Sequence, residues 1–244
     1  MFFFKKKYDL VELLQGFTDI HNHVLPGIDD GAAELNDTMQ MIRAMKEIGI
    51  KDCIPTPHTM EDYYGNDAEV IREKYLHTLE ELKSSDVSGF IAGVASEYML
   101  DAGFEELLEN KELLCLKDNY VLTELSYFQE PANLHHLVFD IQQKGLEPIM
   151  AHPERYRYVK SMETYMDWTG RGFLLQLNLL SLTDHYGKDA QRKAFALLEK
   201  DMYTFAGTDA HRLEHVDKIG CIRLDKKQFE STKKLMENHK LIFD

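Results

Sequence analysis

Cysteine is scarce in this chain of 244 residues. The three cysteines, Cys53, Cys115 and Cys221, are too few and too far apart for a disulfide framework or a Cys-x-x-Cys zinc site. Such sparing use of cysteine is typical of a reducing compartment, so the sequence predicts a cytoplasmic protein.

Long apolar runs and basic clusters are also missing. No run approaches the ~20 apolar residues that a membrane-spanning helix needs, so no transmembrane segment is predicted. The net charge is −14, from 42 acidic and 28 basic residues, and Lys5 to Lys7 form the single basic run. A nucleic-acid-binding protein normally presents a basic face, so nucleic acid is not an expected partner.

No segment rich in proline, glycine or serine divides the chain, which predicts a single domain over residues 1–244. Apolar runs of strand length alternate with stretches of helical periodicity, and this alternation predicts an α/β protein with a parallel sheet. The expected strands are 17–20, 53–56, 90–95, 120–125, 148–151, 173–182 and 202–206. The expected helices are 35–48, 70–82, 135–143, 190–198 and 227–236.

Histidines and carboxylates recur where these runs end. His21 and His23 lie one residue apart after an apolar run, and alternate side chains of a strand share a face. The steps onward from His23 to the next candidates are 35, 39, 27, 28 and 57 residues, close to one βα unit each with one unit skipped. The full set of candidates is His21, His23, Asp30, His58, Glu97, Glu124, His152, Asp209 and His211.

These side chains meet only if the strand ends form a ring. The carboxyl-terminal face of a (βα) barrel is such a ring, so we expect a distorted barrel of about seven strands with a metal site at the C-terminal ends of the strands. Four carboxylates in one pocket would repel one another without cations. Imidazole with carboxylate suits Mn, Fe or Zn better than Mg, and nine ligands imply two or three divalent ions.

Two arginines extend the prediction to a substrate. Arg155 lies three residues after His152, and Arg212 directly follows His211. Guanidinium groups bind phosphoryl oxygens bidentately, so arginines beside a metal cluster indicate a phosphate ester; surface ion pairs are the alternative role for both. No cysteine is followed six residues later by arginine, which argues against a cysteine-nucleophile phosphatase. Tyr63 and Tyr64 belong to a polar, aromatic loop after His58 that serves either as a lid or as ordinary loop packing.

Four segments carry a resemblance to a known family: residues 19–31, Thr56-Pro-His58, 151–156 and 207–211. They are similar to the polymerase and histidinol phosphatase (PHP) superfamily, and most of all to its capsule and exopolysaccharide-associated bacterial protein-tyrosine phosphatases. The similarity runs in order from about residue 17 to 212. Thr59 stands where the family often has a second histidine, directly after the one that matches His58. The family also commonly has a second functional arginine several residues beyond Asp-x-His, and Arg212 is the only arginine near that position.

The resemblance implies a PHP-type barrel with a three-metal site, usually of manganese. His21, His23, Glu97 and Asp209 would hold the first ion, and Glu97 would bridge to a second held by Glu124 and His152. Asp30, His58 and His211 would hold the third, while Arg155 would bind the phosphoryl group.

We therefore expect a metal-dependent phosphotyrosine-protein phosphatase that uses a metal-bridged hydroxide and regulates capsule or exopolysaccharide synthesis. The resemblance implies the tyrosine-rich tail of a bacterial tyrosine kinase as its substrate. Two alternatives remain open at this stage. One is a small-molecule phosphomonoesterase such as a histidinol phosphatase, and the other is a non-catalytic, metal-bound module that binds a kinase.

Overall fold

A parallel sheet of six strands organises the computed structural model, which describes residues 6–110, 113–117 and 119–243. Lys5 of the basic run therefore lies outside the described residues. Neighbouring strands follow one another in chain order: β4 (His58–Thr59), β5 (Glu97–Met99), β6 (Tyr120–Glu124), β7 (Glu147–Ala151), β8 (Leu174–Asn178) and β9 (Tyr203–Gly207). Strand followed by crossover and parallel strand is the arrangement that the sequence predicted.

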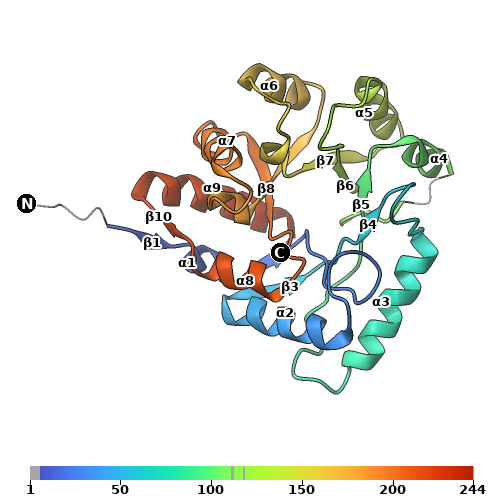
Figure 1. The fold of residues 1–244 in the computed structure, drawn as a ribbon, viewed down its shortest axis with the longest axis vertical. Helices are drawn as coiled ribbons and strands as arrows, with labels where there is room; N and C mark the ends of the chain where they lie inside the picture. The colour runs from blue at the N-terminus through green and yellow to red at the C-terminus, as the bar shows by residue number, and fades with distance from the viewer. Residues whose placement is uncertain (1–5, 111–112, 118, 244) are drawn as a thin grey trace, which may run out of the picture.

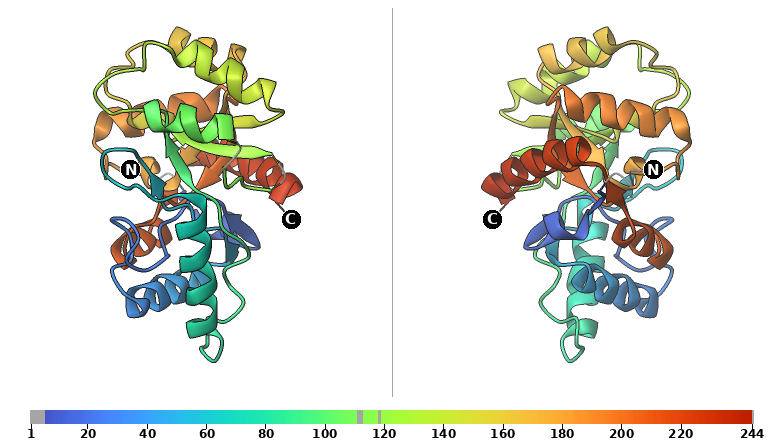
Figure 2. Two further views of the ribbon diagram at one scale, coloured as in Figure 1. Left: turned by 90° about the vertical axis from the view of Figure 1, so that its right-hand side faces the viewer. Right: turned by 90° about the vertical axis from the view of Figure 1, so that its left-hand side faces the viewer.

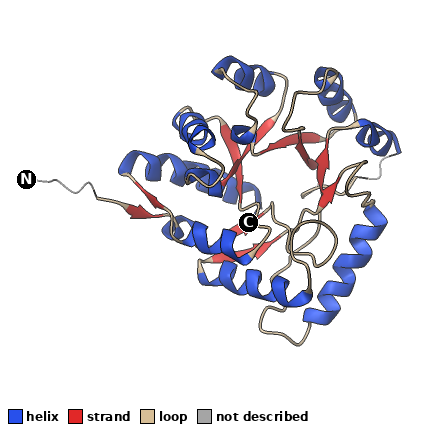
Figure 3. Ribbon diagram, in the orientation of Figure 1, coloured by secondary structure: helices blue, strands red, loops and turns tan. Residues whose placement is uncertain are grey.

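Two further strand pairs complete the sheet structure. β2 (Phe17–Asp19) pairs in parallel with β3 (Ile50–Cys53), and β1 (Tyr8–Asp9) pairs antiparallel with β10 (Arg223–Leu224). Backbone hydrogen bonds join the β2 and β3 segments to both edges of the large sheet. Asp209 N donates to His21 O at 2.7 Å, and Ala95 N, just before β5, donates to Pro55 O, just after β3, at 3.0 Å. The strands thus lie around a common centre (Figures 1 and 3).

Helices surround these strands on the outside (Figure 1). They are α1 (Val11–Leu14), α2 (Leu35–Glu47), α3 (Ala68–Leu82), α4 (Ala102–Asn110), α5 (Leu134–Gln143), α6 (Met162–Gly170), α7 (Lys188–Glu199), α8 (Leu213–Gly220) and α9 (Lys226–Phe243). Two short 3₁₀ turns, Pro153–Arg155 and Leu179–Leu182, follow β7 and β8. All five expected helices are present. The sequence did not predict α1, α4, α6 or α8, each of nine residues or fewer. Among the described residues, no helix combines the length and the apolarity needed to cross a bilayer.

The expected strand at 90–95 is wrong. That segment makes only an isolated bridge, between Ile91 and Cys53, and the strand forms later as β5. Of the expected strand at 53–56, only Cys53 belongs to a strand, β3, and the other three residues lie between β3 and β4. Pro55 and Pro57 lie in the segment between these pieces and have no backbone N–H to donate, so they interrupt the hydrogen-bond ladder on both sides.

The centre enclosed by the strands is filled by apolar side chains. The members of this inner core are Ile20, Ala95, Leu116, Leu122, Ile149, Ala151, Phe205 and Phe243. α9 packs against β9 and β2 beside this core (Figure 2). His239 on α9 is buried and fixes this contact, because its Nε2 lies 2.9 Å from Thr18 O and its Nδ1 accepts from Ala206 N at 3.3 Å. That pairing requires a neutral ring, and burial lowers the pKa of His239 to about 4.

Candidate metal centre

The nine side chains nominated by the sequence converge on one place, most of them from the carboxyl ends of the parallel strands. His21 and His23 follow β2, His58 and Glu97 begin β4 and β5, Glu124 ends β6, His152 follows β7, and Asp209 and His211 follow β9. Asp30 reaches the same place from the loop after β2. Its side chain is 56% exposed, so it lies at the rim of the cluster.

Four of these residues form a buried group. His21 Nε2 lies 3.2 Å from Glu97 Oε2 and 3.4 Å from Asp209 Oδ1. His23 Nε2 lies 3.3 Å from the same Asp209 oxygen. One ligand atom from each of the four residues falls within 4.8 Å of the others, close enough to hold a single ion.

Glu97 also belongs to a second group, with Glu124. His58 Nδ1 lies 3.1 Å from a carboxylate oxygen of each glutamate. His152 Nε2 approaches the same two side chains, at 2.9 Å from Glu97 and 3.9 Å from Glu124. The sequence resemblance had placed His152 here and His58 at another ion, whereas the structure brings both imidazoles to this pair.

A third group lies at the rim. His58 Nε2 and His211 Nε2 lie 3.5 and 3.4 Å from Asp30 Oδ1, and His23 is the fourth member. His58 therefore contacts two groups, one through each ring nitrogen.

Unpartnered buried atoms indicate that this donor set fits metal ions. The Nε2 atoms of His21 and His23, Nδ1 of His58, Oε2 of Glu97 and Oε1 of Glu124 are buried without a hydrogen-bond partner. Buried polar groups in proteins are nearly always hydrogen-bonded. Imidazole nitrogens and carboxylate oxygens that face one another without hydrogen bonds are therefore unfavourable unless cations lie between them. The donors are nitrogen and oxygen without thiolate, as the sequence predicted.

The electrostatics of the group lead to the same conclusion. Burial by itself would lower the pKa of His21, but the Glu97 and Asp209 carboxylates outweigh burial and raise that pKa to about 9. A hydrogen bond from His211 lowers the pKa of Asp30 to about 2. Without metal, these carboxylates attract protons to the imidazoles, and divalent ions would replace those protons.

A second layer of polar residues orients the ligands. His23 Nδ1 lies 2.7 Å from Asp29 Oδ2, and His21 Nδ1 lies 3.0 Å from Gln176 Oε1. Asn178 Nδ2 donates to Asp209 Oδ2 at 2.7 Å. These contacts turn each histidine so that Nε2 faces the cluster. The sequence prediction missed all three partners, although Gln176 and Asn178 alternate as polar residues in an otherwise apolar strand.

The backbone is strained at two of the ligands. His152 and Asp209 have positive φ angles of 35° and 49°, in the left-handed region that residues other than glycine seldom adopt. Gly207 allows the backbone of β9 to approach His21 closely, because a Cβ at this position would lie 2.6 Å from His21 Cβ. Backbone strain of this kind persists only where the surrounding structure imposes it. At His152 and Asp209 the strained backbone places the two side chains in the cluster.

The two nominated arginines differ in position. Arg155 Nη1 donates to Asp209 Oδ2 at 2.5 Å, and its guanidinium lies between Tyr127 and Tyr186, 5.0 and 4.1 Å from their ring centroids. The geometry thus brings Arg155 directly to the cluster. Arg212 is exposed at the N-cap of α8 and lines a separate hollow beside His211.

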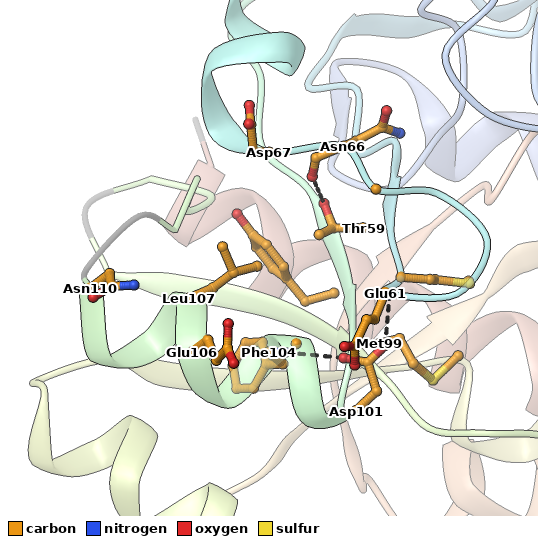
Figure 4. Close-up of a pocket in the computed structure, with 14 residues that line it drawn as sticks. Thr59, Glu61, Asn66, Asp67, Met99, Asp101, Phe104, Glu106, Leu107 and Asn110 are labelled. Atoms are coloured by element: carbon orange, nitrogen blue, oxygen red, sulfur yellow. Dashed lines mark hydrogen bonds between the residues drawn. The ribbon is translucent and has the colours of Figure 1, made fainter.

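Two further hollows lie close to the cluster. One, of about 630 Å³, is lined by Tyr127, Phe128, Arg155, Arg157, His185, Tyr186 and Gly187. The other, of about 310 Å³, lies between the loop after β4 and helix α4, and Figure 4 shows Glu61, Asp67, Asp101 and Glu106 around it. The Tyr63–Tyr64 loop is near this second hollow. The ring of Tyr64 stacks on His58 with centroids 5.6 Å apart, whereas Tyr63 is largely exposed.

The fold and the cluster define a class: α/β proteins with an imidazole and carboxylate centre at the carboxyl ends of parallel strands. The family model for capsular polysaccharide synthesis, CpsB/CapC, matches residues 17–238. The chain belongs to this family.

Characterised relatives agree with this assignment. The chain is 31% identical over 198 residues to tyrosine-protein phosphatase YwqE of Bacillus subtilis, covering 80% of this chain and 78% of the relative. It is 27% identical to the putative tyrosine-protein phosphatase CapC of Staphylococcus aureus, covering 92% of this chain and 90% of the relative. A crystal structure from work on Bacillus subtilis YwqE and Streptococcus pneumoniae CpsB, described there as unique metal-dependent tyrosine phosphatases, is similar with a TM-score of 0.76. It is 28% identical and covers 91% of this chain and 95% of its own.

Proposed function

We propose that this protein is a metal-dependent phosphotyrosine-protein phosphatase. The observation that carries the proposal is the buried cluster of inward-facing, unpartnered imidazole and carboxylate atoms beside Arg155. The relatives named above are tyrosine-protein phosphatases, which supports the choice of phosphotyrosine over other esters.

The residues of the cluster would hold two to three divalent ions, and we propose manganese, with iron or zinc as alternatives. His21, His23, Glu97 and Asp209 would form one site, Glu97 and Glu124 with His152 a second, and Asp30, His58 and His211 a third. Since His58 Nδ1 also contacts both glutamates, His58 is placed to serve the second site as well. When bound, such ions supply a hydroxide nucleophile near neutral pH and neutralise charge on phosphoryl oxygens.

The arginines would act on the substrate itself. We propose that Arg155 binds the phosphoryl group, because one of its nitrogens is held by Asp209 while Tyr127 and Tyr186 fix the plane of the guanidinium. A donor that is already oriented stabilises charge developing on the phosphoryl oxygens without reorganising. Arg212 is a further candidate for a substrate contact, supported by its place beside His211.

The proposal extends to the architecture, the location and the substrate of the protein. We propose that β2, the segment bearing β3 and β4, and β5 to β9 form a distorted seven-stranded barrel of PHP type, supported by the backbone hydrogen bonds that join both edges of the sheet. We also propose that the chain is one domain and acts in the cytoplasm. Its proposed substrate is the tyrosine-rich tail of a bacterial tyrosine kinase, through which it would regulate capsule or exopolysaccharide synthesis.

A steady-state assay on metal-stripped protein re-supplied with Mn, Zn or Mg tests the proposal. The substrates are a phosphotyrosyl peptide and histidinol phosphate. We expect the peptide to have the higher kcat/KM, and we expect His152→Ala and Asp209→Ala to abolish turnover and lower the metal content. The matched control replaces all three cysteines with serine and keeps activity. Full activity after exhaustive chelation would contradict the proposal.

A further inference from the structure

The larger of the two hollows has a composition that neither the metal cluster nor the chemical step explains. Of the seven residues that line it, three are aromatic, two are arginines, and none carries a carboxylate: Tyr127, Phe128, Arg155, Arg157, His185, Tyr186 and Gly187. A lining of this kind is unexpected on a chain of net charge −14. The hollow therefore combines apolar surface with positive charge in a predominantly acidic protein.

The aromatic side chains form a continuous path from the cluster to the surface. The ring of Tyr127 stacks on His152, with centroids 5.9 Å apart and planes 22° apart. Arg155 joins Tyr127 to Tyr186 across the floor of the hollow. Phe128 follows at the outer edge, where its side chain is 92% exposed. Phe128 therefore presents apolar surface at the outer edge of the hollow.

The positive charge of the hollow comes from its arginines. Burial and the neighbouring Lys218 ammonium lower the pKa of His185, so this ring is neutral at pH 7. Arg155 is engaged with Asp209, whereas Arg157 is exposed at the rim. Arg157 therefore offers its guanidinium to an anion outside the reacting phosphate.

The hollow between the loop after β4 and helix α4 has the opposite character. Its lining includes Glu61, Asp67, Asp101 and Glu106 and no lysine or arginine (Figure 4). A peptide carrying acidic residues would be repelled there and attracted toward Arg157. The two hollows thus differ in the charge that they present.

We propose that the hollow lined by Tyr127, Phe128, Tyr186 and Arg157 is a specificity subsite that receives the aryl ring of phosphotyrosine and an acidic residue next to it in the peptide. The inference rests on the proposed function. With the phosphoryl group at Arg155, the ring to which it is bonded lies along Tyr127 and Tyr186, where aromatic pairs at 4.5–7 Å are favourable. Phe128 covers the outer part of the ring or the adjoining backbone, and Arg157 pairs with the flanking carboxylate.

The test measures kcat and KM on phosphotyrosyl peptides flanked by glutamate, alanine or lysine, and on glycerol phosphate, a small aliphatic ester. We expect the wild type to prefer the glutamate peptide over the lysine peptide by roughly fivefold, the range of one exposed ion pair. Arg157→Glu should bring that ratio to one or below. Phe128→Ala should raise KM for all three peptides by roughly 5- to 20-fold. This increase in KM should be at least severalfold larger than the increase for glycerol phosphate.

Matched controls use residues outside the hollow. Phe139 on α5 is exposed, as is Arg192 on α7, and neither lines the hollow. Phe139→Ala and Arg192→Glu should change neither the preference for the glutamate peptide over the lysine peptide nor the KM for the peptides relative to that for glycerol phosphate. If Arg157→Glu and Phe128→Ala behave like these controls while the wild type hydrolyses phosphotyrosyl peptides, the subsite is wrong and the proposed function stands. If the wild type hydrolyses glycerol phosphate but no peptide, the proposed function fails and the subsite fails with it.

Discussion

Replacing Asp29 with asparagine should weaken metal binding although Asp29 is not itself among the predicted ligands. The Asp29 carboxylate accepts three hydrogen bonds: Oδ2 from His23 Nδ1 at 2.7 Å and from His58 N at 3.1 Å, and Oδ1 from Gly31 N at 2.9 Å. Asparagine has the same shape but only one acceptor oxygen. If that oxygen keeps the two donors from His23 and His58, the amide NH₂ faces the N–H of Gly31.

Two effects follow, with different magnitudes. The neutral amide polarises His23 less than the carboxylate does, and loss of such an outer contact typically lowers metal affinity by about 10- to 100-fold. That range corresponds to about 1.4–2.7 kcal/mol of binding free energy. The N–H of Gly31 loses its acceptor, which costs about 1 kcal/mol of folding stability, at the low end for a partly buried donor.

Titration calorimetry of the metal-stripped protein with Mn²⁺, together with thermal unfolding of the same samples, measures both effects. Asp37→Asn is the matched control. Its carboxylate accepts backbone N–H groups of Ala33 and Glu34 at 3.1 and 3.2 Å, at the N-terminus of α2 and away from the ligands. The control should lose stability but keep metal affinity. Equal metal affinity in the wild type and Asp29→Asn would refute the argument that Asp29 orients and polarises His23.

Three further changes have defined outcomes. With the metal ions at saturating concentration, Arg155→Ala should lower kcat/KM on a phosphotyrosyl peptide by about 10²- to 10³-fold; a loss below tenfold would remove Arg155 from the phosphate site. Gly207→Ala should destabilise the fold by about 1–3 kcal/mol through the Cβ contact with His21, while Gly93→Ala, with open space around it, should not. The pKa of His239 is lowered to about 4, so its neutral ring stabilises the fold above pH 6.5 and this contribution is lost as pH falls toward 4. His239→Gln should therefore be less stable than the wild type at pH 7.5, with a gap in the free energy of unfolding that narrows toward pH 5; a constant gap would contradict this role.

Hydrophobic periodicity predicted the long elements well and the interrupted ones poorly. α2 and α3 show full apolar stripes, and β6 and β7 are uninterrupted runs, so their type and position followed from side-chain pattern. Phe90, Ile91 and Ala95 in the run at 90–95 are buried, but the segment beside this run contains Pro55 and Pro57, which cannot donate to a ladder. Which apolar run forms a strand depends on the neighbour that it meets, and pattern alone does not identify that neighbour.

The sequence by itself determined which residues could bind metal. Histidines and carboxylates at strand ends, spaced by one βα unit, nominate all nine side chains that the fold then brings together, because the carboxyl ends of parallel strands share one edge. Only the tertiary structure decided how they are grouped: His58 faces the Glu97–Glu124 pair with one nitrogen and Asp30 with the other. It also decided what orients them: Gln176 and Asn178 contact His21 and Asp209, far away in the chain, at 3.0 and 2.7 Å, and the loop after β2 brings Asp29 to 2.7 Å from His23. Spacing along a chain fixes which strand end carries a residue, whereas ring orientation depends on the side chains packed around it.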